Sequence, residues 1–193
     1  MLCEIMLNLN TEIKNLIIEF PKYWNKKLLR KENLFHKPKE YEKVNYYLET
    51  GIIKIFVTND DKLEETIVAL AGNDTALLPY RENHMQIINV FGMRTITEVV
   101  LHTINADNWN SIKKEKPKLI DEITQLDSIQ ISNKMAKLSL LKSYTDAETR
   151  YKKALEINPF LSKLKYSDIA SYLGISIRTV ADIKSKLNNE NIK

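Results

Sequence analysis

Few residues in this sequence have the type and spacing that enzyme chemistry requires. The histidines His36, His84 and His102 lie far apart and form no His-x-His pair, which metal sites on β-barrels commonly use together with a glutamate. Cys3 is the only cysteine, so oxidation or haem ligation there has no further support from the sequence. No glycine-rich phosphate loop or nucleophile elbow is present. We therefore expect no enzyme activity, no metal and no cofactor.

Basic side chains are concentrated near the C-terminus. Residues 142–193 carry ten Lys and Arg against six Asp and Glu, and this excess equals the formal net charge of +4 of the whole chain. Residues 1–141 are balanced, with 19 side chains of each sign. A basic C-terminal segment favours a polyanionic partner such as nucleic acid. A similar excess is also common on solvated surfaces, so the pattern depends on the elements that carry it.

Two short helices joined by a glycine turn are predicted to position these basic residues. Residues 167–173 are expected to form a capped amphipathic helix that ends at Gly174, and Ser176 can cap a second helix over residues 177–187. Small Ala170 lets the two helices approach. The expected joint core consists of Leu173, Ile175, Val180 and Ile183. This pattern is typical of a helix-turn-helix, whose second helix enters the major groove of DNA; an ordinary helical hairpin is the alternative.

The middle of the chain is predicted to be a β-domain. Short segments rich in β-branched and aromatic residues alternate with turn signals such as Ala71-Gly72-Asn73-Asp74 and Phe91-Gly92. The predicted strands cover residues 34–36, 44–48, 52–58, 65–71, 85–91 and 95–103. Hairpin-sized gaps without helices indicate an antiparallel sandwich or barrel. Before it, residues 11–33 are predicted to be helical, with Thr11 as a cap and Pro21 in the first turn of a second helical piece.

One long helix is predicted over residues 118–142, because Leu119, Ile123 and Leu126 keep helical spacing. A second helix is expected from Thr145, whose Thr-x-x-Glu sequence has the form of a capping box. The sustained apolar stripe favours a dimer seam against a partner helix. Packing of the same stripe on the β-domain is the alternative.

Motifs in both halves of the chain resemble the Crp/Fnr-type bacterial transcription regulators. The segment 169–176 (Ile-Ala-Ser-Tyr-Leu-Gly-Ile-Ser), preceded by Arg150-Tyr151 and Asn158-Pro159, is similar to the C-terminal region of that family. Residues 34–36 and 46–56 are similar to its cyclic-nucleotide-binding-like β-roll. The resemblance implies an α+β fold with an N-terminal antiparallel β jelly roll, a long dimerisation helix and a C-terminal helix-turn-helix. The implied domains are a sensor with N-terminal helices at 1–117, the dimerisation helix at 118–142 and a DNA-binding domain at 143–193.

The function implied by the resemblance is that of a homodimeric, sequence-specific transcription regulator in the cytoplasm. Its implied partner is double-stranded DNA with a pseudo-palindromic operator; RNA polymerase and a small-molecule effector, or no effector, are further candidates, and no membrane is involved. The implied DNA-binding residues are Ser176, Ile177, Arg178, Thr179, Asp182 and Lys184. Arg178 can bind guanine through two hydrogen bonds, Thr179 can contact phosphate or a thymine methyl group, and Lys184 is expected to meet phosphate. Asp182 can accept a hydrogen bond from cytosine, repel phosphate or pair with Lys186.

Three departures from the family pattern change what the resemblance implies. The candidate effector residues Gly72, Asp74 and Arg81 lack the Gly-Glu pair of cyclic-AMP-binding members, and acidic Glu82 follows Arg81. A carboxylate beside the phosphate ligand opposes anion binding, so we expect no binding of cyclic AMP. Ile177 and Asp182 stand where better-known relatives have arginines that reach base edges. Only six residues follow the predicted second helix, so the wing hairpin is expected to be truncated or absent.

Two alternatives of a different class remain at this stage. One is a small-molecule-binding or protein-interaction module whose degenerate helix-turn-helix no longer binds DNA, as Ile177 and Asp182 suggest. The other is an enzyme on a cupin-like barrel, which would need its histidines to converge on a metal.

Overall fold

A computed structural model describes residues 2–38, 43–58, 64–79 and 90–190, with side chains described between residues 9 and 189. The helices are α1 (Leu2–Glu19), η1 (Pro21–Tyr23), α2 (Ala106–Glu115), α3 (Pro117–Ser143), α4 (Ala147–Ile157), η2 (Pro159–Lys163), α5 (Tyr166–Leu173) and α6 (Ile177–Glu190). The strands are β1 (Asn25–Leu29), β2 (Leu34–His36), β3 (Val44–Thr50), β4 (Ile53–Thr58), β5 (Glu65–Ala71), β6 (Thr75–Leu77), β7 (Phe91–Thr95) and β8 (Val99–Asn105). None of the described helices has the length and apolar character that crossing a membrane requires.

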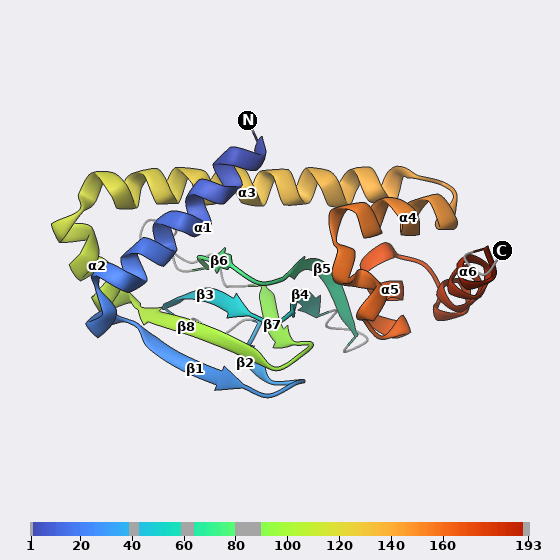
Figure 1. The fold of residues 1–193 in the computed structure, drawn as a ribbon, viewed down its shortest axis with the longest axis horizontal. Helices are drawn as coiled ribbons and strands as arrows, with labels where there is room; N and C mark the ends of the chain where they lie inside the picture. Colours follow the sequence, from blue (N-terminus) through green and yellow to red (C-terminus); the bar gives the residue numbers. More distant parts are fainter. Residues whose placement is uncertain (1, 39–42, 59–63, 80–89, 191–193) are drawn as a thin grey trace.

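The strands form two four-stranded antiparallel sheets, which together make the β-domain (residues 25–105). One sheet has the order β1-β8-β3-β6 and the other β2-β7-β4-β5. Helix α3 runs along both sheets, from α2 at one end of the molecule to α4 at the other (Figure 1). The expected α+β class with an antiparallel β-roll followed by a helix-turn-helix is confirmed.

A large apolar core joins the first sheet to α1, α2 and the start of α3. Its buried members include Ile13, Leu16, Tyr47, Ile104, Trp109, Ile112, Ile120 and Ile123. Trp24 and Trp109 are both buried in it. The core therefore ties the first half of α3 firmly to the β-domain.

The predicted helix over residues 11–33 is wrong in both its bounds and its second half. Helix α1 starts at Leu2 and ends at Glu19, and Pro21 opens only the short 3-10 helix η1. Residues 25–29 form strand β1, which pairs with β8 from Asn25 opposite Thr103 to Leu29 opposite Val99. Lysine and leucine favour a helix when taken alone, but pairing with an existing strand overrides that preference. The exposed lysines suit an edge strand, which must discourage further pairing.

The predicted β-segments are correct in most places and wrong around Gly92. Gly92 lies inside β7 rather than in a turn, opposite Phe56 of β4. Glycine is required there because a Cβ would collide with the ring of Phe56. Strand β8 consequently starts at Val99 instead of Thr95. The structure adds β6 and α2, which the sequence analysis does not predict. Of the predicted strand 85–91, residues 85–89 lie outside the described ones.

The two helices after the β-domain agree with expectation except at one cap. Helix α3 has 27 residues and α4 follows it closely. Asp146, and not Thr145, caps α4: its carboxylate accepts the N–H of Thr149 at 2.7 Å. Aspartate is an equally good N-cap residue, and it stands one position closer to the observed start of the helix.

Candidate nucleic-acid interface

The turn between α5 and α6 is built as the sequence predicts. Gly174 adopts the left-handed conformation, with φ 66° and ψ 42°, and the N–H of Ile175 donates to the carbonyl oxygen of Ala170 at 3.1 Å. A Cβ at Gly174 would meet no atom within 4 Å, so the backbone conformation alone explains the glycine. Ser176 then caps α6, because its Oγ accepts the N–H of Thr179 at 3.0 Å.

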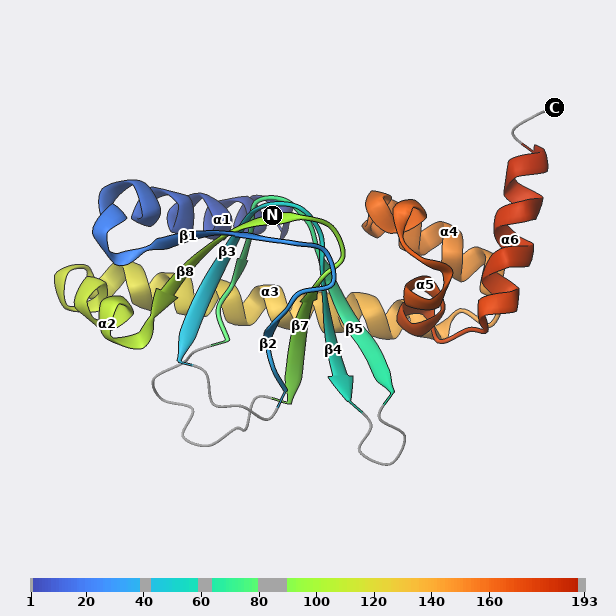
Figure 2. The same cartoon turned by 90° about the horizontal axis from the view of Figure 1, so that it is seen from below.

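The predicted joint core of the two helices is confirmed. Leu173, Val180 and Ile183 are buried and Ile175 packs against them, while Ala170 is buried where the helices meet. The remaining surface of α6 therefore points away from α5. Figure 2 shows α6 at the end of the molecule remote from α1, crossing the direction of α3.

Four of the six predicted DNA-binding residues share this exposed surface at the start of α6. Ser176, Ile177, Arg178 and Asp182 are exposed, and we call these four the outer face of α6. Ile177 is 55% exposed, so its side chain is available for contact with a partner molecule. Arg178 and Asp182 are one helical turn apart, so both project from the same side of the helix.

The other two predicted residues are engaged within the protein. The half-buried Thr179 has its hydroxyl 2.7 Å from that of Ser176, so the cap engages both side chains, although Ser176 is exposed. Lys184 donates from Nζ to the carbonyl oxygen of Ser162 at 2.8 Å and lies 4.8 Å from the ring centre of Tyr166. Partial burial lowers the pKa of Lys184. A phosphate contact by Lys184 would require this lysine to leave Ser162.

The arginine of the Arg150-Tyr151 motif supports the turn from behind. Arg150 donates from Nη1 to the carbonyl oxygen of Leu173 at 2.9 Å and from Nε to that of Tyr144 at 3.2 Å. It thus links the end of α5 to the connection between α3 and α4. Asn158 similarly donates from Nδ2 to the hydroxyl of Tyr172 at 3.0 Å. Residue type does not reveal these supporting roles. Every residue has a backbone carbonyl group, so the sequence does not indicate which carbonyl Arg150 binds, and it does not indicate that Asn158 lies near Tyr172.

The candidate effector residues are only partly described. Gly72 and Asp74 lie in the loop between β5 and β6, and Arg81 lies outside the described residues. Asp74 accepts a hydrogen bond from the hydroxyl of Tyr47 at 2.8 Å, and its carboxylate lies 3.7 Å from Nζ of Lys14. Burial and then the bond to Asp74 raise the pKa of Tyr47 far above its usual value. Whether these residues bind an effector stays a prediction.

The described histidines have partners within the β-domain. Nδ1 of buried His36 lies 3.1 Å from the hydroxyl of Tyr46, and Nε2 of His102 lies 2.6 Å from a carboxylate oxygen of Glu49. His84 lies outside the described residues. Among those described, no group of three His, Cys, Asp or Glu side chains is arranged to hold a metal ion.

Comparison with known proteins identifies the architecture. No protein-family model and no curated protein sequence matches the chain. Among solved structures, FixK2 from Bradyrhizobium japonicum matches with a TM-score of 0.71 at 15% identity, over 88% of this chain and 86% of that one. The c-di-GMP-responsive regulator CLP of Xanthomonas campestris matches with a TM-score of 0.71 at 17% identity, over 92% and 93%. A Crp/Fnr-family regulator from Eubacterium rectale matches with a TM-score of 0.66 at 14% identity, over 92% and 82%.

The chain has the Crp/Fnr fold. The three alignments include both the β-domain and the C-terminal helices, since each covers at least 88% of the chain. The resemblance drawn from the sequence is thereby confirmed for the architecture. Identities of 14–17% establish a shared fold only.

Proposed function

We propose that this protein is a homodimeric, sequence-specific DNA-binding transcription regulator. The observation that carries the proposal is the outer face of α6, which presents Ile177 and Arg178 to solvent at the start of the second helix of a helix-turn-helix. That end of the helix is the part that contacts base edges in such motifs. The helix-turn-helix also belongs to the segment that carries the whole net positive charge of the chain.

Arg178 is proposed to bind a guanine base, because its guanidinium can donate two parallel hydrogen bonds to O6 and N7. Ile177 is assigned an apolar contact with a thymine methyl group. Ser176 and the backbone N–H groups at the start of α6 suit a phosphate oxygen. Asp182 is assigned the selection of cytosine, because its carboxylate can accept a hydrogen bond from the cytosine amino group. It disfavours other bases at that position.

The surface of α3 supports dimerisation. One side of the helix is buried within the protein through Ile120, Ile123 and Leu141. Part of the apolar stripe therefore packs inside the subunit and is not available to a partner helix. Outside that contact, apolar side chains remain exposed along its second half: Ile129, Ile131, Met135 and Leu140, at 41%, 43%, 57% and 59%. Ile131 and Met135 lie on one side of the helix and Ile129 and Leu140 on nearly the opposite side, so a second copy of α3 would cover one of these two pairs.

We further propose that the β-domain does not bind cyclic AMP. Asn73 and Asp74 occupy the stretch in which cyclic-AMP-binding members have their ribose and phosphate ligands. Here the amide oxygen of Asn73 accepts the N–H of Gly51 at 2.7 Å, and Asp74 accepts from Tyr47. Both side chains are thus engaged within the β-domain, and the carboxylate would repel a phosphate.

Selection of random duplex DNA by the purified protein, without added ligand and at near-physiological salt, tests the proposal. We expect enrichment of a two-fold symmetric motif with half-sites about one helical turn apart, and affinity that falls steeply with salt. Sedimentation of the free protein measures dimerisation separately. A folded dimer that enriches no motif, with or without extracts of small molecules, would contradict the proposal and favour an interaction module with a silent helix-turn-helix.

A further inference from the structure

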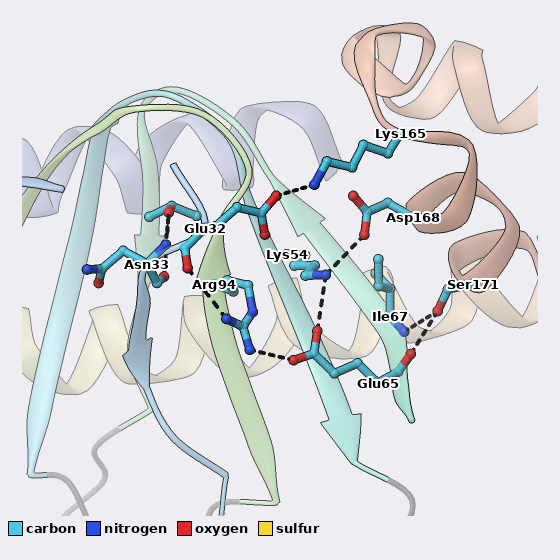
Figure 3. Close-up of polar contacts among 10 residues, drawn as sticks. Glu32, Asn33, Lys54, Glu65, Ile67, Arg94, Lys165, Asp168 and Ser171 are labelled. Carbon is cyan, nitrogen blue, oxygen red and sulfur yellow. Dashed lines mark hydrogen bonds and ion pairs between the residues drawn. The ribbon is translucent and has the colours of Figure 1, made fainter. Parts of the chain in front are cut away.

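Helix α5 lies along the outer edge of the second sheet. Strand β5 is the last in the order β2-β7-β4-β5, so its outer edge faces no further described strand. Ser171 of α5 occupies that edge: its Oγ accepts the N–H of Ile67 at 2.9 Å and donates to the carbonyl oxygen of Glu65 at 3.2 Å (Figure 3). These backbone groups are the ones that an additional strand would bind. One side chain of the helix-turn-helix therefore completes the hydrogen bonding of the β-domain.

A group of four charged side chains lies beside this contact. Nζ of Lys54 is 3.0 Å from Asp168 of α5 and 3.1 Å from Glu65, and Glu65 is in turn 2.7 Å from Arg94 (Figure 3). The side chains of Lys54 and Asp168 are only 12% and 11% exposed. Two positive and two negative charges balance, so the group is neutral only while α5 supplies Asp168. A pair this deeply buried is costly to separate inside the protein.

Apolar packing makes the contact part of the core. Ile67, Leu70 and Ile96 of the β-domain belong to the same buried cluster as Leu161, Leu164 and Ile169 of the C-terminal helices. The helices of residues 147–190, which we call the C-terminal unit, thus share a core with the second sheet. An exposed pair between Lys165 and Glu32 adds little to it.

The loop after β5 makes a second contact with the C-terminal unit. A Cβ built on Gly72 would lie 3.0 Å from the ring of Phe160 in η2, so this ring packs directly on the glycine backbone. The next two residues, Asn73 and Asp74, are hydrogen-bonded to the β-domain. The loop that the sequence suggests as an effector site therefore touches the C-terminal unit directly.

We propose that the outer edge of β5 and Gly72 form a docking surface for the C-terminal unit, and that this surface fixes the orientation of α6. The contact at Gly72 then couples the loop at residues 72–74 to α6 directly, without a change in α3. The docking itself stands on the contacts above, whereas its effect on operator binding rests on the proposed function. The outer face of α6 stays exposed while α5 is docked, so docking directs the recognition helix without covering it. The short connection between α3 and α4, residues 144–146, is the point about which a released unit turns.

Hydrogen exchange of the full chain, without DNA, tests the docking. Lys54→Met leaves Asp168 buried without its cation, and Ser171→Ala leaves two backbone groups of β5 without their partner. We expect the amides of α5 and of Ile67 to exchange about tenfold faster, relative to those of β3 and β8, in each variant. The control is Lys153→Met, which removes a lysine from an exposed pair with Glu156 within α4. An unchanged ratio of α5 to β3 and β8 exchange in both variants would overturn the docking.

Binding to DNA then tests the coupling, in these two variants and in Gly72→Val, whose side chain would displace the ring of Phe160 from the loop. All three variants are expected to lose most of the preference for a duplex with two half-sites over a duplex with one, because the two recognition helices are no longer held at a fixed spacing. The affinity for a single half-site should be unchanged. Equal preference in wild type and variants would overturn the coupling. A protein that binds no duplex in any form would refute the proposed function and leave the exchange result standing.

Discussion

The two helices of the helix-turn-helix differ in what their surfaces do. The outer face of α6 is solvent-exposed and carries side chains suited to DNA, including an exposed isoleucine. Helix α5 instead has Asp168 and Ser171 engaged with the β-domain, through a nearly buried ion pair and a strand edge. In the helix-turn-helix, α6 is therefore proposed to contact DNA, whereas α5 contacts the β-domain.

This difference means that the two functions can be altered separately. A substitution on the outer face of α6 has few intramolecular contacts to disturb, so it should change DNA binding and leave stability intact. A substitution at the α5 contact removes buried interactions, so it should change stability and orientation first.

Breaking the docking contact is expected to have the largest effect. Lys54→Met should lower the free energy of unfolding by about 3 kcal/mol, because Asp168 remains nearly buried without its lysine. Adding Asp168→Leu should regain most of that loss, since the second charge is then gone as well. Denaturant unfolding of the wild type, both single variants and the double variant measures the coupling. Additive effects of the two substitutions would show that the pair does not act as a unit.

Removing the proposed base contact is expected to separate recognition from stability. Arg178→Ala should weaken binding to the selected operator by about 1–3 kcal/mol and relax the preference at one base pair, with unfolding unchanged. Lys153→Ala on α4 is the matched control, because it removes one positive charge from an exposed helix outside the outer face of α6. Equal losses for both variants would mean that Arg178 contributes only charge.

Much of the fold can be predicted from local patterns. Strand β5 follows its predicted bounds over residues 65–71, because a short run of apolar and β-branched residues lies there between turn signals. The turn at Gly174 and the cap at Ser176 are also predicted correctly, since a left-handed residue and an N-cap both depend on neighbours within four positions.

Contacts between distant segments could not be predicted in this way. Lys54 and Asp168 are 114 positions apart, and neither residue type nor spacing indicates that they meet. Strand β1 shows the same limit: its lysines favour a helix locally, and only pairing with β8 makes it a strand. For the candidate site, the motif predicts the outer face of α6 but not the contact of Lys184 with Ser162.

Straining the turn between the helices should have a smaller effect than breaking the docking contact. Gly174→Ala is expected to cost about 1–2 kcal/mol of stability, because alanine tolerates a φ of 66° poorly. No atom lies within 4 Å of the new methyl group, so steric collision does not contribute. Gly174→Asn should cost less, since asparagine adopts this conformation more readily. Denaturant unfolding compares the three proteins; equal stability of wild type and Gly174→Ala would exclude strain at this turn.

The smallest expected effect is a dependence of docking on acidic pH. Burial alone would raise the pKa of Glu65, but hydrogen bonds from Arg94 and Lys54 outweigh it and hold the pKa below the usual 4.5. A carboxyl group whose pKa is lower in the folded protein stabilises it fully above the unfolded value, and that contribution is lost as the pH falls through the folded value. The exchange of α5 amides relative to those of β3 and β8 should therefore begin to increase below pH 4.5. In Glu65→Gln the group no longer titrates, so part of this pH dependence should disappear; an identical pH profile in both proteins would remove Glu65 from the docking contact.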